Sequence, residues 1–278
     1  MSIKPNADED FHSLSNSMML GMKALKLQLF DDDRRQLSDA TGFMIAEDNR
    51  LFLYTCWHVV SGVDPSNVRP KDAPKRRRYL KIHSVNVVSQ PGMTSFGDNF
   101  EFEIDLYPDG STPLWLQDPD AVDAPDLKAI GITVPKFIDV VRIPMDGFPN
   151  VDLAFEEPDL SHQLIQAGND VILIGYPYAY SVMGSSSPEP VFLKRTVASN
   201  RHPIAATQLL DGAGFKCMSG SPVCIFYQNR YWLYGIYNGI IYPDNPTGEN
   251  PRPNELASLG KITNLVIARA YMGVQKFN

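Results

Sequence analysis

Cys217-Met218-Ser219-Gly220-Ser221-Pro222-Val223 stands between segments whose composition is typical of strands. Glycine permits backbone geometry that other residues resist, so a tight turn at this point leaves the Ser219 side chain exposed. Short clusters of Ser, Gly and Pro are usually plain turns. A serine hydroxyl is a weak nucleophile until a nearby base takes its proton. Ser219 is therefore a candidate nucleophile only if such a base lies within hydrogen-bond reach.

A histidine suited to this task occurs in the segment Leu53-Tyr54-Thr55-Cys56-Trp57-His58-Val59-Val60, which follows Thr41-Gly42-Phe43-Met44-Ile45. A single histidine among apolar residues is more often a core residue than a catalyst. His58, however, comes where a predicted strand ends, and a long stretch of chain separates it from Ser219. Histidine titrates near neutral pH, which suits a group that takes a proton from a serine hydroxyl. We therefore expect Ser219 as nucleophile and His58 as general base.

As a set, these segments resemble those of the trypsin-like serine peptidases of the chymotrypsin fold, in their bacterial-type cytoplasmic branch. Residues 41–45 and 53–60 resemble the family's histidine segment, and Met218–Val223 resembles its nucleophile segment. Val171–Pro177 is similar to the first strand of the family's second barrel, and Gly235–Gly239 to the strand that lines its primary specificity pocket. The resemblance implies a serine endopeptidase with two packed six-stranded antiparallel β-barrels and an active site between them. It implies neither a metal nor an organic cofactor.

Hydrophobic alternation and turn residues predict an all-β protein with a terminal helix. We expect a flexible N-terminus over 1–15, a first barrel over 16–160 with a long insertion at about 64–125, and a second barrel with a C-terminal helix over 161–278. The helix is expected within Glu255–Tyr271, although Gly260 weakens its pattern. Inside the insertion, Lys75–Arg78 is interpreted as a solvated loop or a guard of an edge strand rather than a recognition patch. The expected strands are Ala24–Phe30, Gly42–Ala46, Leu51–Cys56, Tyr79–Ile82, Val85–Val88, Phe100–Leu106, Val171–Gly175, Val191–Ala198, Ser221–Phe226 and Tyr231–Tyr237.

The resemblance also implies an aspartate that holds the imidazole of His58 in the correct tautomer. In the family this aspartate opens a strand between the histidine and the serine. Asp139, Asp152 and Asp126 each begin an apolar segment in that interval. Asp152 has the most family-like local sequence, because a small residue follows it two places later.

Spacing favours Asp139 over the other two aspartates. From Asp139 to Gly175 the chain runs 36 residues, against 23 from Asp152. The longer interval leaves room for an extra strand at Val151–Phe155 and for the crossing into the second barrel. Asp126 places a lysine where a small buried residue is expected. We predict the triad His58, Asp139 and Ser219, with Asp152 and then Asp126 as alternatives.

The family forms its oxyanion hole from two backbone N–H groups, which here belong to Ser219 and Cys217. The position of Cys217 usually holds glycine, and another residue presents its N–H there only if its backbone angles allow it. A preformed hole and a hole that forms on substrate binding both stay open. Cys217 as an alternative nucleophile is disfavoured, because the following Gly-Ser-Pro fits Ser219. A zinc site is disfavoured as well, because Cys217, Cys224 and His202 lack ligand spacing.

Three further positions bear on activation and specificity under this resemblance. Met218 replaces the aspartate that binds a freed N-terminus in secreted members, so activation by N-terminal clipping is not expected. Ala213 stands where a charged residue selects Lys or Arg, so selection for basic residues is not expected either. Ile240 is expected to narrow the specificity pocket in favour of small or medium apolar side chains.

Composition and charge limit the other classes of function. The formal net charge of −7 argues against a nucleic-acid partner. No apolar run reaches membrane-spanning length, so no membrane partner is expected. The three cysteines form no disulfide framework and no secretory signal is visible, so we expect a cytoplasmic protein. Its partners are expected to be a protein or peptide substrate and a regulatory protein. The alternative function is a catalytically silent or latent protease-like binding module.

Overall fold

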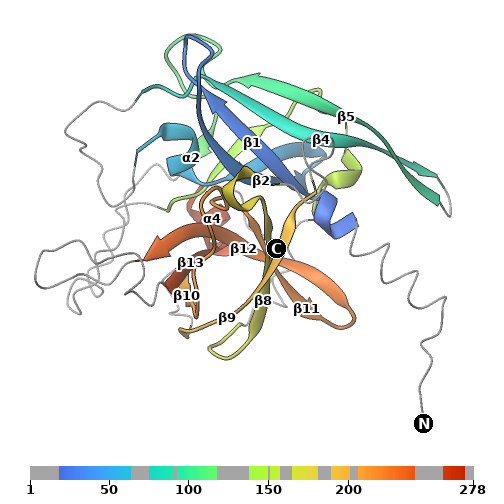
Figure 1. The fold of residues 1–278 in the computed structure, drawn as a ribbon, viewed down its shortest axis with the longest axis vertical. Coiled ribbons are helices and arrows are strands. Elements are labelled where there is room, and N and C mark those ends of the chain that lie inside the picture. The colour runs from blue at the N-terminus through green and yellow to red at the C-terminus, as the bar shows by residue number, and fades with distance from the viewer. Residues whose placement is uncertain are drawn as a thin grey trace, which may run out of the picture.

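The described chain forms two antiparallel β-sheets and a short C-terminal helix, which confirms a mostly-β fold. The computed structural model describes residues 19–63, 75–90, 93–117, 138–149, 151–156, 165–180, 189–200, 206–241 and 259–272. The N-terminus expected to be flexible, residues 1–15, lies outside these ranges. The strands of the first sheet gather at one end of the molecule and those of the second sheet at the other (Figure 1).

The first sheet has the strand order β5-β4-β1-β2-β3-β7-β6. It therefore holds seven strands where six were expected, because the two-residue strand β6 adds to its edge. β1 has the predicted bounds, and its alternating apolar residues are buried on one side. The two short strands predicted over 79–82 and 85–88 are parts of one long strand, β4. The strands are β1 (Ala24–Phe30), β2 (Gln36–Glu47), β3 (Arg50–Thr55), β4 (Tyr79–Gln90), β5 (Met93–Asp105), β6 (Leu116–Gln117) and β7 (Val141–Pro144).

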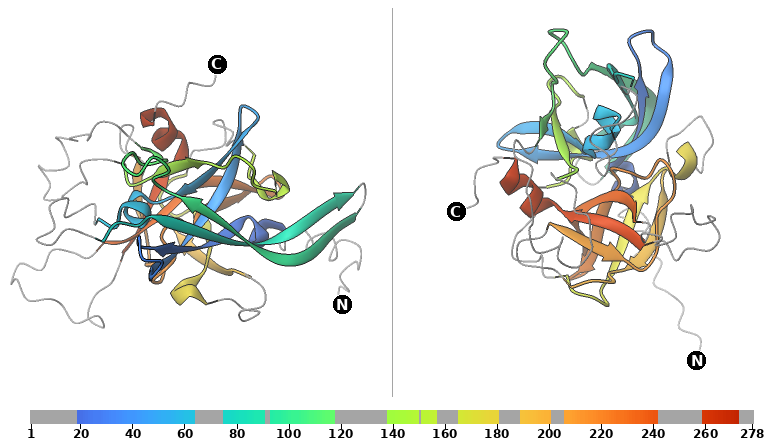
Figure 2. Two further views of the ribbon diagram at one scale, coloured as in Figure 1. Left: turned by 90° about the horizontal axis from the view of Figure 1, so that it is seen from above. Right: turned by 90° about the vertical axis from the view of Figure 1, so that its left-hand side faces the viewer.

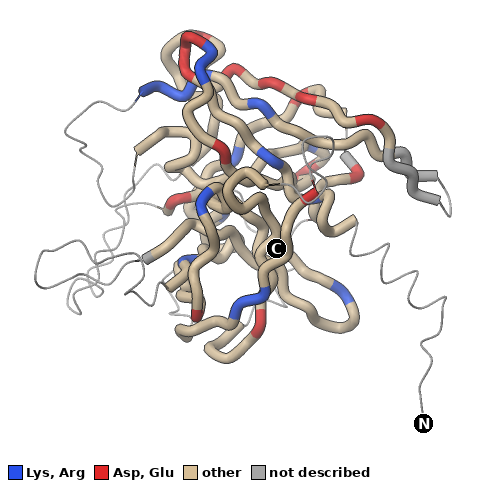
Figure 3. The backbone as a smooth tube through the Cα atoms, in the orientation of Figure 1, with Lys and Arg blue, Asp and Glu red and all other residues tan. Residues whose placement is uncertain are grey.

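β4 and β5 form a long hairpin that extends from the body of the molecule (Figure 2). β4 pairs with β1 from Tyr79 to His83, so both strands of the hairpin, which fall within the predicted insertion, belong to the first sheet. β5 is the edge strand, and acidic residues recur along its backbone (Figure 3). Glu101 and Glu103 bind Lys81 and Arg34 respectively. A charged edge of this kind resists pairing with further strands.

The second sheet has the strand order β10-β13-β12-β11-β8-β9. Its two edge strands are linked at their ends: Ala198 N–H donates to Leu209 O at 2.8 Å, and Asp211 N–H donates to Thr196 O at 2.9 Å. The sheet therefore curves far enough for its own edges to meet. The strands are β8 (Asp170–Gly175), β9 (Val191–Thr196), β10 (Thr207–Leu210), β11 (Pro222–Tyr227), β12 (Arg230–Ile241) and β13 (Leu259–Asn264).

Two local predictions differ from the structure. A C-terminal helix is confirmed as α4 (Leu265–Tyr271), but its bounds differ from the predicted Glu255–Tyr271, because residues 259–264 form β13 between β10 and β12. α4 begins where the Asn264 side chain accepts a hydrogen bond from Ile267 N at 3.1 Å, a typical N-cap. The strand expected at Val151–Phe155 is instead the 3₁₀ helix η1 (Val151–Leu153), followed by a single parallel bridge from Phe155 to Ile45.

The larger hydrophobic core joins the first sheet to parts of the second. Buried side chains of β1 to β3 pack in one cluster with Ile236 of β12 and with Leu265 and Ala268 of α4. A smaller cluster, which includes Leu173 and Val223, lies within the second sheet. The shared core fixes the segment before α2 (Trp57–Ser61) against β12. Among the described residues, no helix has the length and apolar character needed to cross a membrane.

Candidate active site

His58 lies in the first turn of α2, directly after β3. This five-residue helix ends at Gly62, whose left-handed φ of 77° lets its N–H donate back to His58 O at 3.1 Å. Arg77 closes the same end, because its guanidinium donates to His58 O at 2.7 Å and also to Val59 O. Burial lowers the pKa of Arg77. The basic run at 75–78 is therefore not simply solvated, since Arg77 holds the helix that carries His58.

Asp139 contacts His58 twice. One carboxylate oxygen lies 2.7 Å from His58 Nδ1, and the other accepts the His58 backbone N–H at 2.9 Å. Asp139 is buried and His58 is half-buried. Of the other aspartates considered, Asp152 is an exposed residue of η1, and Asp126 lies outside the described residues. The structure thus brings Asp139, and not Asp152, to the imidazole.

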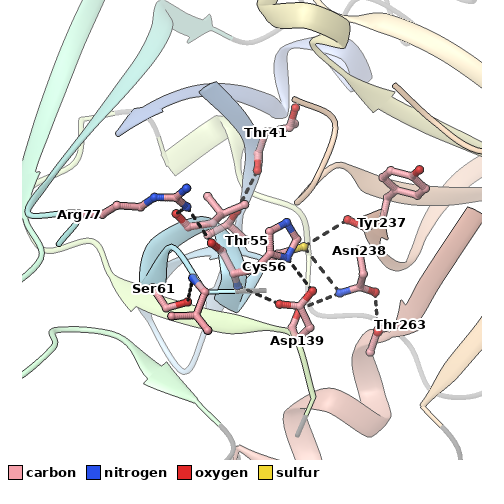
Figure 4. A network of polar contacts seen from close by, with 12 residues as sticks. Thr41, Thr55, Cys56, Ser61, Arg77, Asp139, Tyr237, Asn238 and Thr263 are labelled. Atoms are coloured by element: carbon pink, nitrogen blue, oxygen red, sulfur yellow. Dashed lines mark hydrogen bonds and ion pairs between the residues drawn. The ribbon is translucent and has the colours of Figure 1, made fainter. Parts of the chain in front are cut away.

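Two residues that the sequence did not single out fix Asp139 from behind (Figure 4). Asn238 Nδ2 donates to Asp139 O at 2.7 Å, and Asn238 Oδ1 accepts the Thr263 hydroxyl at 2.6 Å. Both side chains are buried. A polar residue buried in an apolar strand needs a hydrogen-bond partner. The asparagine within Gly235–Gly239 was therefore a sign in the sequence that Asn238 binds another buried polar group. Thr263 carried no comparable signal, because its place in β13 was not predicted.

The turn that carries Ser219 is held by Thr41 of β2. Thr41 N–H donates to Ser219 O at 3.0 Å, and the Thr41 hydroxyl donates to Cys217 O at the same distance. Thr41 is completely buried. A residue of the first sheet therefore positions residues 217–221, the predicted nucleophile turn, which leads into β11 of the second sheet.

Gly220 fits this turn because it has no side chain. Its φ is 90°, and a Cβ built on it would lie 2.0 Å from Thr41 O and 2.4 Å from the Thr55 hydroxyl. Both the backbone angle and the lack of space exclude other residues. The close packing of Gly220 brings the nucleophile turn against β2 and β3, immediately before α2.

A shared acceptor joins the nucleophile turn to the histidine segment. Tyr237 O accepts the Gly220 N–H at 2.8 Å and the Cys56 S–H at 3.3 Å, so the neighbours of Ser219 and His58 meet on one carbonyl. The half-buried Ser219 hydroxyl faces Gly239, since a Cβ at that glycine would lie 4.0 Å from Ser219 Oγ. Gly239 thus leaves space beside the hydroxyl.

Cys217 adopts the left-handed conformation, with a φ of 72°. This is the region that glycine enters freely and other residues enter at a cost. Within the described part of the chain, the N–H groups of Cys217 and Ser219 donate to no backbone carbonyl, whereas the N–H groups of Met218, Gly220 and Ser221 do. The two N–H groups predicted for the oxyanion hole are therefore the two left available in this turn.

The thiol of Cys217 is poorly suited to act as a nucleophile. Burial and, to a smaller extent, the charge of Asp39 raise its pKa above the usual value. A thiol is a good nucleophile only as the thiolate, so a raised pKa lowers its reactivity at neutral pH. This disfavours the alternative in which Cys217, rather than Ser219, attacks a substrate.

Among the residues that the structure describes, Cys56, His58 and Asp139 have donor atoms close enough to hold a metal, within 4.8 Å of one another. However, Cys56 Sγ, His58 Nδ1 and both carboxylate oxygens of Asp139 already take part in hydrogen bonds. Cys56 Sγ faces Tyr237 O, and burial raises the pKa of its thiol well above the usual value. Both Asp139 oxygens bind His58. The group is arranged as a hydrogen-bonded pair next to a neutral thiol rather than as a ligand set.

The positions expected to set specificity lie near Tyr237. Its hydroxyl accepts the Gly214 N–H at 2.7 Å, and a Cβ at Gly214 would lie 2.9 Å from its ring. Ala213 O accepts two hydrogen bonds from Arg195, at 2.9 and 3.2 Å. Met218 is completely buried, and Ile240 is half-buried in β12. The Tyr237 ring, which sequence reasoning did not weigh, therefore packs against the backbone of Gly214, the residue that follows Ala213.

No protein-family model matches the chain, and no curated protein is detectably similar to it.

Proposed function

We propose that the protein is a serine endopeptidase of the trypsin-like type, with Ser219 as nucleophile, His58 as general base and Asp139 as the residue that orients the imidazole. The observation that carries the proposal is the pair of contacts from the buried Asp139 carboxylate to His58, next to the turn that carries Ser219. A carboxylate can only accept hydrogen bonds, so His58 Nδ1 is the donor in this pair. Nε2 is then free of a proton and can accept one from a serine hydroxyl.

The reaction follows from these roles. Ser219 Oγ attacks the carbonyl carbon of a peptide bond as its proton passes to His58 Nε2, and the Cys217 and Ser219 N–H groups bind the oxyanion that forms. His58 then protonates the leaving amine, which departs and leaves an acyl-enzyme. Water releases the acyl group by the same steps in reverse. Asp139 stabilises the imidazolium throughout and needs no proton of its own.

The finer architecture belongs to the same proposal. We interpret the two sheets as two packed β-barrels, and the hydrogen bonds between the ends of β9 and β10 support closure of the second. The partner is a protein or peptide substrate. All three cysteines are unpaired, which fits the reducing cytoplasm as the site of action.

A fluorophosphonate probe, which labels an activated serine, tests the proposal. The native protein is expected to react, and Ser219→Ala and His58→Ala to lose at least about a hundredfold in labelling rate. Ser221→Ala is the matched control, because Ser221 lies in the same turn, is buried, and has no hydrogen-bond partner for its hydroxyl among the described residues.

Two outcomes would contradict the proposal. A native protein that the probe does not label favours the alternative of a silent protease-like binding module. Equal labelling of native protein and Ser219→Ala would assign the reactive group to another residue. Both results are independent of substrate choice, because the probe reports on the serine itself.

A further inference from the structure

Two exposed aromatic side chains stand beside the nucleophile turn. Tyr178 of η3 (Pro177–Ala179) is 68% exposed, and Phe215, four residues before Ser219, is 41% exposed. Their ring centroids lie 5.8 Å apart with the planes tilted by 40°. We call these two residues the aromatic pair. Large apolar side chains normally leave water on folding, so an exposed pair of rings next to a reactive turn calls for an explanation.

The backbone of η3 is fixed directly to the segment that leads into the turn. Tyr178 N–H donates to Lys216 O at 2.7 Å. The Ala179 N–H donates to Tyr176 O at 3.1 Å, which closes the turn at the base of η3. The aromatic pair is therefore attached to the residues immediately before Ser219, and its position relative to the nucleophile is set by the fold.

The backbone at this point is strained. Tyr178 and Ala179 have φ values of 53° and 60°, so two consecutive residues other than glycine are left-handed. Such a conformation costs free energy and persists only where surrounding contacts enforce it. Here the enforced conformation holds the Tyr178 ring outward against Phe215. Strain that maintains an exposed ring beside a reactive turn points to a binding role rather than to stability.

We infer that the aromatic pair binds an apolar or aromatic side chain of the peptide substrate close to the bond that is cleaved. The inference rests on the proposed function. Fully extended chain spans about 3.5 Å per residue, so Phe215 lies at most about 14 Å from Ser219. An extended substrate covers that distance in about four residues. The recognised side chain therefore lies within about four positions of the scissile bond.

Substrate profiling with paired variants tests this inference. Peptides carry either Phe or Ser at one of the four positions on each side of the cleaved bond, and kcat/KM is measured for the native protein and for Tyr178→Asn with Phe215→Ser. Asparagine tolerates left-handed backbone, so it preserves the η3 conformation. At one of these positions, kcat/KM of the double variant for the Phe peptide is expected to be about tenfold lower than that of the native protein, because KM is higher. At the same position, kcat/KM for the Ser peptide is expected to be unchanged.

The control is Phe226→Ser. Phe226 is 60% exposed on β11 and contacts Tyr231 with centroids 5.0 Å apart, so it matches the aromatic pair in chemistry but not in place. This variant is expected to keep the native profile, and the fluorophosphonate labelling rate of all variants is expected to equal that of the native protein.

The outcomes separate the two proposals. Native protein that is not labelled overturns the proposed function, and this inference with it. Normal labelling with no position-selective loss in the double variant overturns the inference alone. An equal loss on every peptide also overturns it, because the substitutions would then act on the turn. A native dimer that becomes a monomer in the double variant would assign the pair to self-association instead.

Discussion

At the scale of single residues, the backbone of Cys217 sets the direction of its N–H group, to which the proposed function assigns a place in the oxyanion hole. Sequence reasoning identified a departure from glycine at this position but not its conformation. The left-handed φ of 72° shows that Cys217 adopts the geometry that glycine would provide. Hydrogen bonds from Thr41 to Cys217 O and Ser219 O enforce it. The departure in sequence is thus compensated by a residue that is distant in the chain.

Cys217→Gly is expected to stabilise the protein by about 0.5–1 kcal/mol, because relief of left-handed strain outweighs the greater chain entropy of glycine. It is also expected to keep fluorophosphonate labelling, because the N–H group stays in place and the proposed nucleophile is Ser219 rather than Cys217. Urea unfolding and the labelling rate measure both effects. Cys217→Val serves as the contrast, since a β-branched residue is disfavoured at positive φ and should destabilise. Loss of labelling in the glycine variant would show that the thiol takes part in the reaction.

At the scale of elements, α2 depends on residues outside its own sequence. The helix has only five residues, too few to be stable alone, and Arg77 binds the carbonyls of His58 and Val59 at its end. The orientation of His58 toward Asp139 therefore rests on a guanidinium from the segment before β4. A basic run that reads as a surface feature in the sequence thus supports the site.

Arg77→Met is expected to slow fluorophosphonate labelling on the order of tenfold or more, because a small displacement of a general base strongly reduces its effectiveness. Arg76→Met is the control. Arg76 binds Gly110 O at 2.7 Å and stacks on Tyr107, so its guanidinium is directed to another part of the first sheet's surroundings than that of Arg77. Equal labelling of the two variants would mean that Gly62 and Asp139 suffice to place His58.

At this scale, the sequence predicts elements whose pattern is local, but not those whose conformation depends on pairing with distant strands. β1 was predicted to the residue because its alternating pattern is local and its turn is charged. β13 was missed because its strand conformation comes from pairing with β10 and β12, and its sequence alone also fits a helix. The choice of Asp139 followed from counting residues between elements, although η1 replaced the strand for which room was left. Asn238 and Thr263 were missed because their roles depend on contacts between separate strands.

At the scale of the whole molecule, a buried ionic cluster ties the C-terminal helix to the first sheet. Arg269 of α4 is 1% exposed, and its Nε lies 3.3 Å from Glu47 of β2. Glu47 also binds Arg142 at 2.9 Å and accepts the hydroxyl of Tyr54. Burial and the charge of Glu47 raise the pKa of Tyr54 well above its usual value, so this hydroxyl stays a donor. Elements from both ends of the chain therefore meet on one carboxylate.

Arg269→Met is expected to destabilise the protein by about 1.5–3 kcal/mol, because it removes one of the two guanidinium partners of the buried Glu47 carboxylate. Combining it with Glu47→Gln should cost less than the sum of the two single changes, because the amide can still bond Tyr54 and Arg142 without a buried charge that lacks its partner. Urea unfolding of the three variants measures this coupling free energy. If the helix and the first sheet form one cooperative unit, tryptophan fluorescence and far-ultraviolet dichroism lose their signals at the same urea concentration in every variant. Additive effects of the two substitutions would show that α4 is held by its apolar side chains, Leu265 and Ala268, and that the ionic cluster contributes no coupling between the ends of the chain.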